Sequence, residues 1–420
     1  MRIAITGMGV VSPIGLSVDG FDAALLAGRL GIRAAPWSTP ETPSLFGRVD
    51  DAFVATDWMD ERVVRGTDGF ARFALAACAQ AVADAGLDGD GALDTFRTAV
   101  VHGTSMGGLF SLGRAQWMYD RHGADAVDPK TQIKIWCNMA AAQICMRYDL
   151  HGPSMTVTTA CASSLDALGT AAMYLESGLA DVALVGATEG GYTCDSPDDT
   201  GFVLATSAAE VSYGMATGGA DPTRAMLPFA ADRAGIVSGE GSAFFVLETP
   251  AHAAARRARV HAWLTGYASL ADAHHPSSPE PTGRWEARVM GLAQRSAGVS
   301  PTEVDVLVAH ATGTPKGDEA EIRALNSVLV EAGNDHVVVT GLKGHTGHTG
   351  ASSGGMNVIA GIRAMHGGRL AHVAGTTTLD PEIHFDVALR EPRAVDVHVL
   401  QANSFGFGGQ DASIVVQRED

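Results

Sequence analysis

The chain is poor in cysteine, in aromatic residues and in positive charge, and these shortages exclude several classes of protein. Its 420 residues include five cysteines, an odd number without metal-ligand spacing, which argues against a disulfide framework and a metal site. Lysine and arginine number 29 against 47 aspartates and glutamates, so the net charge is −18, and binding to nucleic acid or to an anionic membrane is not favoured. The cysteines fit reduced thiols, and we expect a cytoplasmic protein.

Long apolar runs are also missing. No stretch reaches the length that a helix needs to span a membrane. The segment 1–15 is apolar, but glycines and Pro13 interrupt it, so it predicts a first strand and a turn rather than a signal peptide. The rest of the composition, with 46% apolar and 18% charged residues, is typical of a globular protein with more than one structural unit.

Strand and helix patterns alternate along the chain, which predicts an α/β architecture. Runs of β-branched and apolar residues predict strands at 2–6, 98–102, 155–160, 181–186, 243–248, 260–268, 304–309, 337–340 and 395–401. Helical patterns predict helices near 19–28, 70–86, 162–178, 285–297, 318–332 and 350–366. The composition of 213–226 and 273–284 predicts surface loops.

A weak internal repeat relates the two halves of the chain. Residues 98–105 and 305–314 both contain a strand pattern that ends in histidine, a small residue and threonine. The strand, cysteine and helix at 155–178 correspond to a strand, loop and helix at 337–366. These similarities predict two related halves, 1–250 and 251–420, with chance matching of glycine-rich strand ends as the alternative.

Cys161 occupies the most informative position in the sequence. It stands in the run 155–166, between a β-branched strand pattern and a helical pattern. A thiol there lies on a sharp turn at the positive end of a helix, where the dipole and free backbone N–H groups favour the thiolate. Because an ordinary thiol has a pKa of about 8.5, a nucleophilic cysteine needs such activation at neutral pH. We expect the helix terminus to supply it without a base in hydrogen-bonding reach.

A second segment with candidate catalytic residues begins at His310. This histidine follows the apolar strand pattern 304–309, and the small residues after it let backbone and substrate approach closely. Asp318 and Glu321 lie at the start of the next helix, where carboxylates suit the helix dipole. A lone histidine at a strand end is more often structural, but this flanking pattern favours a functional one.

Two further glycine-rich segments carry candidate residues. Lys343, His345 and His348 follow another strand pattern, and a buried lysine there needs a carboxylate partner such as Glu321. Near the C-terminus, the run Asn403-Ser-Phe-Gly-Phe-Gly-Gly forms a turn whose backbone N–H groups could stabilise an oxyanion. The alternatives are a flexible polar loop and a simple hairpin turn.

Together these segments resemble the β-ketoacyl-acyl carrier protein synthases of the Cys-His-His type, in the thiolase superfamily. The resemblance covers essentially the whole chain and implies a thiolase fold, with duplicated βαβαβαββ halves in an α-β-α-β-α layered sandwich. The matching motifs, in chain order, are Ile-Thr-Gly-Met-Gly-Val-Val-Ser-Pro-Ile-Gly near the N-terminus, Asn138-Met-Ala-Ala, Gly152-Pro, Thr159-Ala-Cys-Ala-Ser, Gly239-Glu-Gly, His310-x-Thr-x-Thr-x-x-Gly-Asp-x-x-Glu321, Lys343-x4-His348-x2-Gly-Ala and Asn403-Ser-Phe-Gly-Phe-Gly-Gly.

The resemblance implies a decarboxylative Claisen condensation that gives a β-ketoacyl-acyl carrier protein. Cys161 would take the acyl chain from a carrier protein as a thioester. His310 and His348 would promote decarboxylation of the malonyl thioester and hold the enolate oxygen. We choose His348 over His345 because it falls five residues after Lys343, at the family spacing.

Supporting roles follow from the same resemblance. Lys343 would orient His310 and form an ion pair with Glu321, and Asp318 belongs to the same motif. The backbone N–H groups of Cys161 and Phe407 would form the oxyanion hole, and the Phe407 side chain would gate the second substrate. Neither a metal nor an organic cofactor is implied, since the phosphopantetheine belongs to the carrier protein.

Several positions depart from the family pattern. Leu227-Pro-Phe-Ala230 replaces Arg-Pro-Phe-Asp, Arg233-Ala234-Gly replaces Arg-Asp-Gly, Gln410-Asp411 replaces Thr-Asn, and Ala311 replaces a glycine. These changes leave the reaction intact but favour a type II polyketide or polyene pathway over housekeeping fatty-acid elongation, which stays the alternative.

The resemblance also implies partners. The synthase would pair with an acyl carrier protein through Arg62 and Arg65, although an ordinary solvated helix face would carry the same arginines. It would form a homodimer, or a heterodimer with a chain-length-factor homologue, with residues 136–140 near the interface. Met106 matches the family position that lines the acyl pocket, with plain core filling as the alternative.

Other classes fit less well. A thiolase needs a second cysteine near the C-terminus, and no cysteine follows Cys194. The synthases that pair cysteine with histidine and asparagine lack a segment like that around Lys343 and His348. A non-catalytic chain-length factor lacks the active cysteine that this chain has. A structural protein with a vestigial site remains a further alternative, which the absence of both acylation and malonyl turnover would favour.

Overall fold

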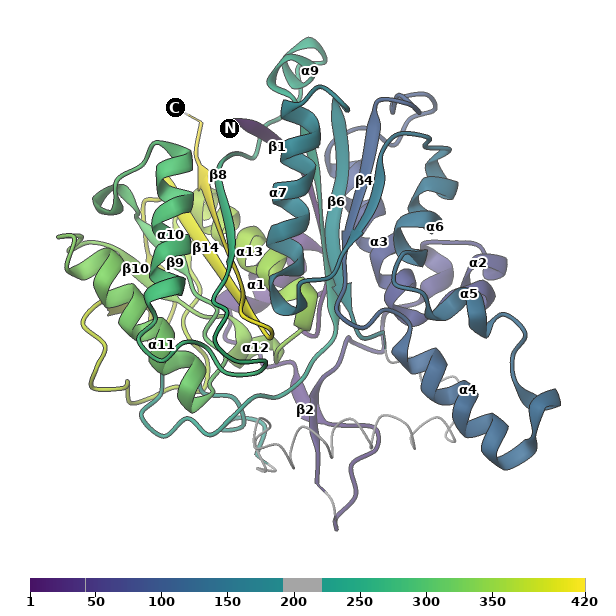
Figure 1. Ribbon diagram of the computed structural model, residues 1–420, viewed down its shortest axis with the longest axis horizontal. Coiled ribbons are helices and arrows are strands. Elements are labelled where there is room, and N and C mark those ends of the chain that lie inside the picture. The colour runs from purple at the N-terminus through teal and green to yellow at the C-terminus, as the bar shows by residue number, and fades with distance from the viewer. Residues whose placement is uncertain (42, 192–220, 420) are drawn as a thin grey trace.

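A computed structural model describes residues 1–41, 43–191 and 221–419 of the chain. Its main feature is an eleven-stranded mixed sheet in the order β12-β10-β9-β14-β15-β8-β1-β7-β6-β4-β5 (Figure 1). At the centre of the sheet, β1 (Ile3–Val11) lies antiparallel to β8 (Ala262–Ala271), with Ile3 opposite Leu264. The chain therefore places its first strand beside the strand that opens the C-terminal half.

The two sides of this sheet repeat the same pattern. On one side β4 runs parallel to β5 and β6, and β7 runs antiparallel to β6 and β1. On the other side β9 runs parallel to β10 and β14, and β15 runs antiparallel to β14 and β8. The strands are β4 (Thr98–Gly103), β5 (Ser154–Val157), β6 (Val182–Glu189), β7 (Gly241–Glu248), β9 (Val306–Val308), β10 (Val338–Thr340), β12 (Asp386–Val387), β14 (Val399–Gly406) and β15 (Gln410–Gln417). The predicted duplication is confirmed by this order, whereas the boundary at residue 250 stays a prediction.

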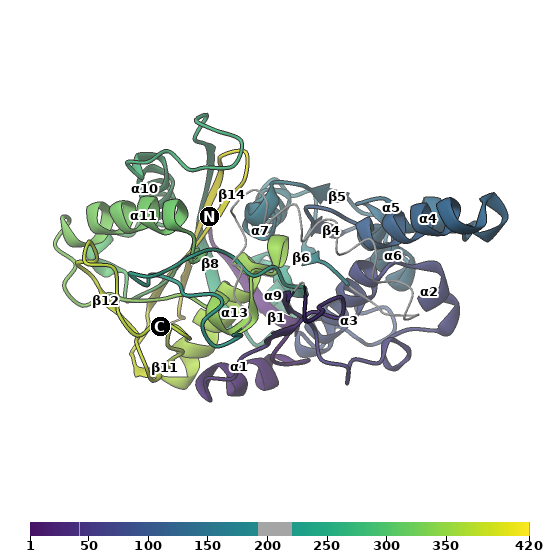
Figure 2. The same cartoon turned by 90° about the horizontal axis from the view of Figure 1, so that it is seen from below.

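Helices cover the two halves in layers. Helix α3 (Gly69–Asp84) packs on β1, β6 and β7, while α7 (Ser163–Glu176) packs on the opposite side of β4 and β6. Helix α13 (Ser353–Gly367) contacts α7 and also packs on β14 and β9. Helix α10 (Arg284–Ala297) covers β8 and β15, beside α11 (Pro315–Leu325). The contacts confirm the α-β-α-β-α order, in which α7 and α13 form the shared middle layer (Figures 1 and 2).

The remaining elements are shorter or peripheral. Figure 2 shows α4 projecting from the N-terminal half, away from α10 and α11. The remaining helices are α1 (Val18–Leu26), α2 (Glu61–Gly66), α4 (Leu109–His122), α5 (Thr131–Ile135), α6 (Met139–Tyr148), α9 (Pro250–Ala255) and α12 (Lys343–Thr346), and the short strands are β2 (Ile32–Ala34), β3 (Leu45–Gly47), β11 (Arg369–Leu370) and β13 (Arg393–Ala394). In the described part of the chain no helix combines the length and hydropathy of a membrane span.

The glycines of β1 explain why the first motif is rich in small residues. A Cβ added at Gly9 would lie 2.0 Å from the carbonyl oxygen of Ala77, and one at Gly7 would lie 2.1 Å from that of Ala81. Both oxygens belong to α3, so the absent side chains let the helix backbone pack directly on the strand. Either substitution would push α3 off the sheet.

Several element boundaries differ from the sequence expectation. The strand predicted at 155–160 ends at Val157, and a 3₁₀ turn over Ala160–Ala162 precedes α7. Helix α11 begins at Pro315 because Thr314 caps it and proline suits a first helical position. Strand β15 and helices α4 and α6 were not predicted. The loop predicted over 273–284 is confirmed up to Gly283, since α10 begins at Arg284. In the loop predicted over 213–226, Ala225 and Met226 are buried, and residues 213–220 lie outside the described part.

Candidate active site

Cys161 lies on a tight turn between β5 and α7. Ala160, directly before it, has a φ of +49°, a left-handed conformation that is strained for a residue with a side chain. The turn is held by Ser163, whose hydroxyl donates to the carbonyl of Ala160 at 2.6 Å and accepts the N–H of Thr159 at 3.0 Å. From the C-terminal half, Ser404 donates to the carbonyl of Cys161 at 2.7 Å. The thiol is therefore fixed where the two halves meet.

His310 is held by the backbone and by a carboxylate on α11. It follows β9, and the next residue, Ala311, also has a positive φ of +44°. Glu321 accepts the N–H of His310 at 2.8 Å and that of Ala311 at 2.6 Å. Both side chains are nearly inaccessible, at 6% exposed for His310 and 1% for Glu321. The carboxylate thus stabilises a strained turn that presents the imidazole.

Lys343 contacts the same histidine from α12. Its ammonium donates to the carbonyl oxygen of His310 and lies 3.3 Å from Nδ1 of the ring. Because an ammonium only donates, Nδ1 must accept, and the ring proton of neutral His310 is on Nε2. The expected ion pair with Glu321 was wrong as a direct contact: among the described ion pairs none joins these two residues, since Glu321 is occupied by the two backbone N–H groups.

His348 completes the arrangement around the thiol. Its Nε2 atom lies 3.0 Å from Sγ of Cys161, and its ring meets that of His310 edge-on with centroids 5.5 Å apart. The Nδ1 atom faces the hydroxyl of Ser353 at 3.5 Å. His345 instead bonds the carbonyl oxygens of Arg29 and His372, at 3.0 and 2.8 Å. The structure therefore brings His348 to the thiol and leaves His345 in the scaffold.

Burial controls the charge of these groups. Burial and then the Lys343 charge hold the pKa values of His310 and His348 well below the usual range, so both rings are neutral. Burial also raises the pKa of Cys161 to about 11, against the lowering effects of Lys343 and of the backbone N–H groups of Phe407 and Cys161. Burial thus opposes the thiolate that the helix terminus is expected to favour, and the resting thiolate stays a prediction. The expectation of no base within hydrogen-bonding reach is wrong, because Nε2 of His348, which can accept a proton, lies 3.0 Å from Sγ of Cys161.

A buried carboxylate that the sequence reasoning missed joins segments of both halves beside the site. Glu189, at the end of β6, accepts the N–H groups of Ser105, Met106 and Ala351 at 2.9, 3.1 and 3.2 Å. These groups come from both halves of the chain, so Glu189 ties the two halves together beside the site. Its only sequence signal is a charged residue at the end of an apolar strand pattern.

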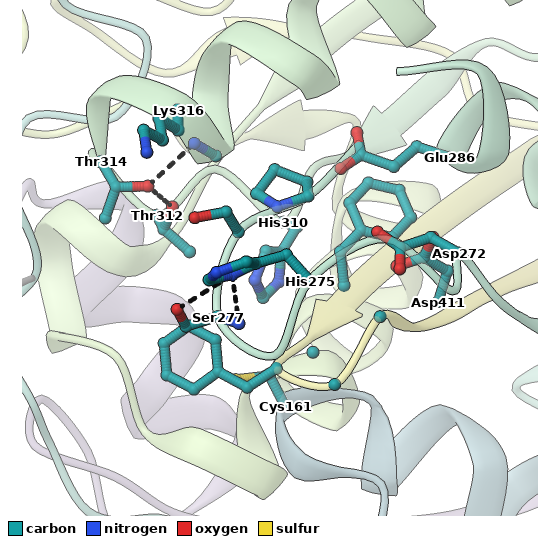
Figure 3. Close-up of a pocket in the computed structure, with 18 of the residues that line it drawn as sticks. Cys161, Asp272, His275, Ser277, Glu286, His310, Thr312, Thr314, Lys316 and Asp411 are labelled. Carbon is teal, nitrogen blue, oxygen red and sulfur yellow. Dashed lines mark hydrogen bonds between the residues drawn. The ribbon is translucent and has the colours of Figure 1, made fainter. Parts of the chain in front are cut away.

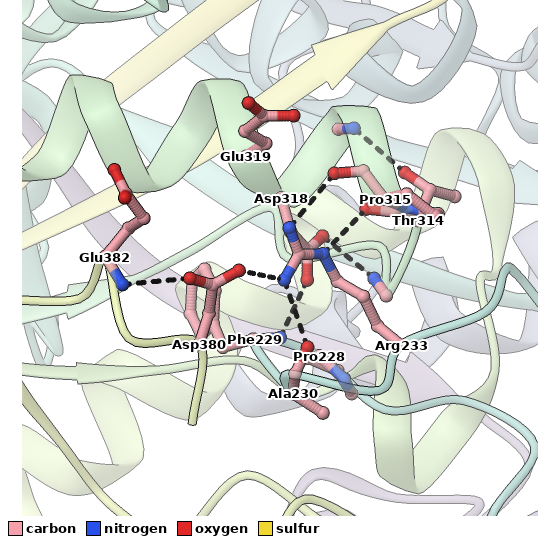
Figure 4. A network of polar contacts seen from close by, with 12 residues as sticks. Pro228, Phe229, Ala230, Arg233, Thr314, Pro315, Asp318, Glu319, Asp380 and Glu382 are labelled. Atoms are coloured by element: carbon pink, nitrogen blue, oxygen red, sulfur yellow. Dashed lines mark hydrogen bonds and ion pairs between the residues drawn. The ribbon is translucent and has the colours of Figure 1, made fainter. Parts of the chain in front are cut away.

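Arg233 organises the segment that follows His310 (Figure 4). Its guanidinium donates to the carbonyl oxygens of Thr314 and Pro315 at 3.2 and 3.1 Å and forms an ion pair with Asp380. Asp318 accepts the N–H groups of Phe229 at 2.7 Å and Gly313 at 2.9 Å. Asp318 is therefore a scaffold residue of the loop rather than a group facing the thiol.

A cavity of about 400 Å³ opens onto this set of residues (Figure 3). Cys161, His310 and His348 line it together with Phe407, whose side chain is 47% exposed. Met106 does not line this cavity and is 54% exposed, so it is not core filling, and its acyl-pocket role stays a prediction. Arg62 and Arg65 are exposed on α2, where Arg65 pairs with Glu61 at 2.8 Å, and their docking role is likewise untested.

Cys161, His310 and His348 also have the donor atoms of a possible metal site. Donor atoms of Cys161, His310 and His348 lie within 4.8 Å of one another, and thiolate and imidazole are zinc ligands. The Lys343 ammonium, however, lies 3.3 Å from His310 and repels a second cation. A thiol, a group that can accept its proton and a neutral ring N–H donor in one cavity suit thioester chemistry.

Fold and site together define an acyl-transferring condensing enzyme of the thiolase fold. The profile of the β-ketoacyl synthase N-terminal domain matches residues 1–253, and that of the C-terminal domain matches residues 261–377. The chain belongs to the β-ketoacyl synthase family.

Known proteins resemble it over their full length. It is 32% identical to "3-oxoacyl-[acyl-carrier-protein] synthase 2" of Synechocystis sp., covering 99% of this chain and 98% of that protein. Among solved structures, "The ishigamide ketosynthase/chain length factor" superposes with a TM-score of 0.89 at 30% identity, covering 100% of this chain and 99% of that one. A type II PKS acyl carrier protein in complex with its ketosynthase, AntDE:AntF, gives a TM-score of 0.86 at 25% identity, covering 100% and 99%.

Proposed function

We propose that the chain condenses an acyl thioester, held on Cys161, with malonyl-acyl carrier protein to give a β-ketoacyl-acyl carrier protein and CO₂. The observation that carries the proposal is the 3.0 Å contact between Sγ of Cys161 and Nε2 of His348, in a cavity that His310 also lines. A nucleophile, its base and a hydrogen-bond donor therefore converge where a thioester can enter.

The first step loads the acyl group. His348 accepts the thiol proton through Nε2, and the sulfur of Cys161 attacks the thioester carbonyl carbon. The backbone N–H groups of Cys161 and Phe407, both close to the thiol, stabilise the oxyanion. The carbon–sulfur bond to the carrier breaks, and its thiol leaves with the proton from His348.

The second step forms the carbon–carbon bond. The malonyl thioester loses CO₂, and the electron pair of the broken bond passes into an enolate whose oxygen accepts the Nε2–H of His310. Lys343 positions this donor by occupying Nδ1, and His348 lies beside the same oxygen. The enolate carbon attacks the acyl carbonyl on Cys161, the carbon–sulfur bond breaks, and the thiolate released takes a proton from solvent.

The test is intact mass of the purified chain after incubation with a set of acyl-acyl carrier proteins, alongside the Cys161→Ala variant. We expect an acyl adduct on the wild-type chain and none on the variant. An adduct that appears only after a homologous subunit is added would identify an obligate heterodimer. No adduct in either condition would contradict the catalytic role and favour a non-catalytic subunit of the chain-length-factor type.

We assign the reaction to type II polyketide or polyene synthesis, with housekeeping fatty-acid elongation as the alternative. The changed residues 227–230, 233–235 and 410–411 support this choice, as does the likeness to a ketosynthase/chain length factor. The product formed from malonyl-acyl carrier protein and the preferred acyl group distinguish the two: successive extensions without reduction indicate polyketide synthesis. A single extension fits both a polyene pathway and the fatty-acid alternative, and faster extension of a 2,4-dienoyl group than of a saturated acyl group of equal length indicates the polyene pathway.

We further propose an acyl carrier protein and a second synthase subunit as partners. Arg62 and Arg65 offer positive charge on an acidic chain. Trp136, Ile133 and Met155 expose 53%, 53% and 44% of their surface, and β5, which carries Met155, is an edge strand. Sedimentation with and without a chain-length-factor homologue tells a homodimer from a heterodimer.

We also propose that residues 1–250 and 251–420 form the two halves of the protein and that the protein is located in the cytoplasm.

A further inference from the structure

The catalytic cavity carries a lysine at its opening. The segment that follows β9 lines one wall of the cavity through His310, Thr312, Thr314 and Lys316. His310 and Thr312 are 6% and 9% exposed, Thr314 is half-buried and Lys316 is exposed, so this wall runs from the catalytic residues to the surface. Figure 3 shows Thr312, Thr314 and Lys316 together on one side of His310. The mechanism proposed above uses the buried end of this wall and leaves Lys316 without a role.

The charge of Lys316 is not neutralised by a direct partner. Among the described residues that line the cavity, it is the only lysine or arginine. No ion pair or side-chain hydrogen bond in the described part of the chain involves its ammonium. The acidic residues that follow it are engaged elsewhere, since Glu319 pairs with Arg323 and Asp318 accepts backbone N–H groups of the loop. The ammonium is therefore available to a ligand.

The backbone that carries Lys316 is held in place. Thr314 caps the first turn of α11 with its hydroxyl. Arg233 donates to the carbonyl oxygens of Thr314 and Pro315 at 3.2 and 3.1 Å, and its own charge is neutralised by the ion pair with Asp380. The guanidinium is therefore occupied by the scaffold, whereas the Lys316 ammonium extends from a fixed base at the cavity opening.

Lysine is rare in this chain. The sequence has four lysines, namely Lys130, Lys134, Lys316 and Lys343, in a protein with a net charge of −18. Position 316 is one of the unspecified positions in the motif His310-x-Thr-x-Thr-x-x-Gly, so the motif that carries the family resemblance does not account for this lysine. A single ammonium at the opening of a catalytic cavity favours an anionic ligand there.

The proposed reaction brings an anionic group to this opening. The carrier protein holds its thioester on a phosphopantetheine arm, which has the sulfur at one end and a phosphate at the other. The sulfur end must reach Sγ of Cys161, and a cavity of about 400 Å³ is too small for the carrier protein itself. The phosphate, which joins the arm to the carrier protein, therefore stays near the opening. An ammonium there supplies the charge and the donors that phosphate oxygens accept.

We propose that Lys316 is a substrate-binding residue that recognises the phosphate of the phosphopantetheine arm. This inference rests on the proposed function, since it concerns the thioester that the site receives. The ammonium is exposed, so solvent and salt screen its charge, and its effect on binding is modest and falls with ionic strength. A carboxylate on the surface of the carrier protein is the competing ligand for the same ammonium.

The test compares two small thioesters that differ only in this phosphate, malonyl-pantetheine and malonyl-phosphopantetheine. CO₂ release by the full chain is followed at pH 7, at low salt and in a buffer without phosphate, and kcat/KM is measured for each thioester. We expect the wild-type chain to prefer the phosphorylated thioester about two- to fivefold, as is typical of an exposed ion pair. The preference should shrink as salt is added.

Three variants locate the source of the preference. Lys316→Gln removes the charge and should bring the ratio of the two kcat/KM values to near one, whereas Lys316→Arg should keep most of the preference. Lys130→Gln removes an exposed lysine outside the cavity and should keep the wild-type ratio. Because each ratio is measured within one protein, a general loss of activity cancels.

The outcomes are separable. Loss of the phosphate preference in Lys316→Gln alone supports the inference. A wild-type chain that turns over malonyl-acyl carrier protein but shows no phosphate preference, whether both small thioesters react equally or neither reacts, overturns it and leaves the proposed function standing. An unchanged preference in Lys316→Gln also overturns it, and a slower reaction of that variant with the carrier protein alone would then identify a carrier carboxylate as the ligand. Absence of turnover of every malonyl thioester overturns the proposed function, and this inference with it.

Discussion

The two halves of the molecule repeat one strand order, yet they carry different chemistry. His102 in β4 and His310 after β9 occupy corresponding strand ends. His102 is fully buried between Phe70 and Phe244, both its ring nitrogens lack partners among the described residues, and burial lowers its pKa to about 3. His310 instead meets Lys343 and lines the cavity.

The difference shows what distinguishes a structural histidine from a candidate catalytic one at corresponding positions of a duplicated fold. Both strand ends carry a buried histidine, but His102 faces Phe70 of α3, and only the C-terminal half adds a buried lysine and open space beside the ring. The N-terminal half contributes the thiol and the turn that holds it. Neither half contains a complete site, so the reaction depends on their junction.

The largest effect should follow removal of the thiol. Cys161→Ala should lower β-ketoacyl formation by at least about 10³-fold, because no acyl intermediate can form. The rate of product formation from acyl and malonyl thioesters checks this. Cys145→Ala, which removes a free thiol outside the cavity, should keep the wild-type rate, and a similar loss there would show that the assay reports general damage.

The corresponding histidines should respond oppositely to substitution. His310→Ala should lower decarboxylation by about 10²–10³-fold, since an enolate donor is lost. His102→Leu should leave that rate within about threefold and keep or raise the thermal midpoint, because it removes a buried polar group that has no partner. Malonyl decarboxylation rates and melting curves of the two variants check the comparison, and equal losses of activity would break it.

The pH dependence should reveal Lys343. Burial lowers its pKa to about 8, and the protonated form is the one that donates to His310. Activity should therefore be full below this pH and fall as pH rises through about 8. The Lys343→Met variant should be about tenfold or more slower, and its rate should not fall over this pH range. A wild-type profile that stays flat to pH 10 would contradict the role of the ammonium.

The smallest effect should come from the surface of the N-terminal half. Replacing Arg62 and Arg65 together by alanine should raise KM for acyl carrier protein about three- to tenfold with little change in kcat, since exposed charges act mainly on association. A short pantetheine thioester, which has no acidic protein to dock, is the control and should be unaffected. An equal rise in KM for both substrates would contradict a role of these arginines in docking the carrier protein.

Much of this arrangement could be predicted from the sequence, and its limits have physical causes. Cys161, His310, Lys343 and His348 could be predicted as site residues because they follow strand patterns in segments rich in glycine and other small residues, and the local pattern determines where a strand ends. The thiol pKa could not be predicted, since it depends on burial by the other half. The hydrogen-bond partners of Glu321 could not be predicted either, because a carboxylate near a lysine can instead accept backbone N–H groups.

Two further side chains illustrate the same limit, because they act on segments that are distant in the chain. Glu189 accepts the N–H of Ala351, and Arg233 donates to the carbonyl oxygen of Thr314. Contacts of this kind depend on how distant elements pack together, which no local pattern reports.

The central claim is that Cys161 carries the loading step and His310 the decarboxylation step, and one measurement tests it directly. CO₂ release from malonyl-acyl carrier protein and acyl-adduct formation are measured together on Cys161→Ala and His310→Ala. We predict that Cys161→Ala still releases CO₂ but forms no adduct, and that His310→Ala forms the adduct but releases little CO₂. Loss of both activities in both variants would contradict the division.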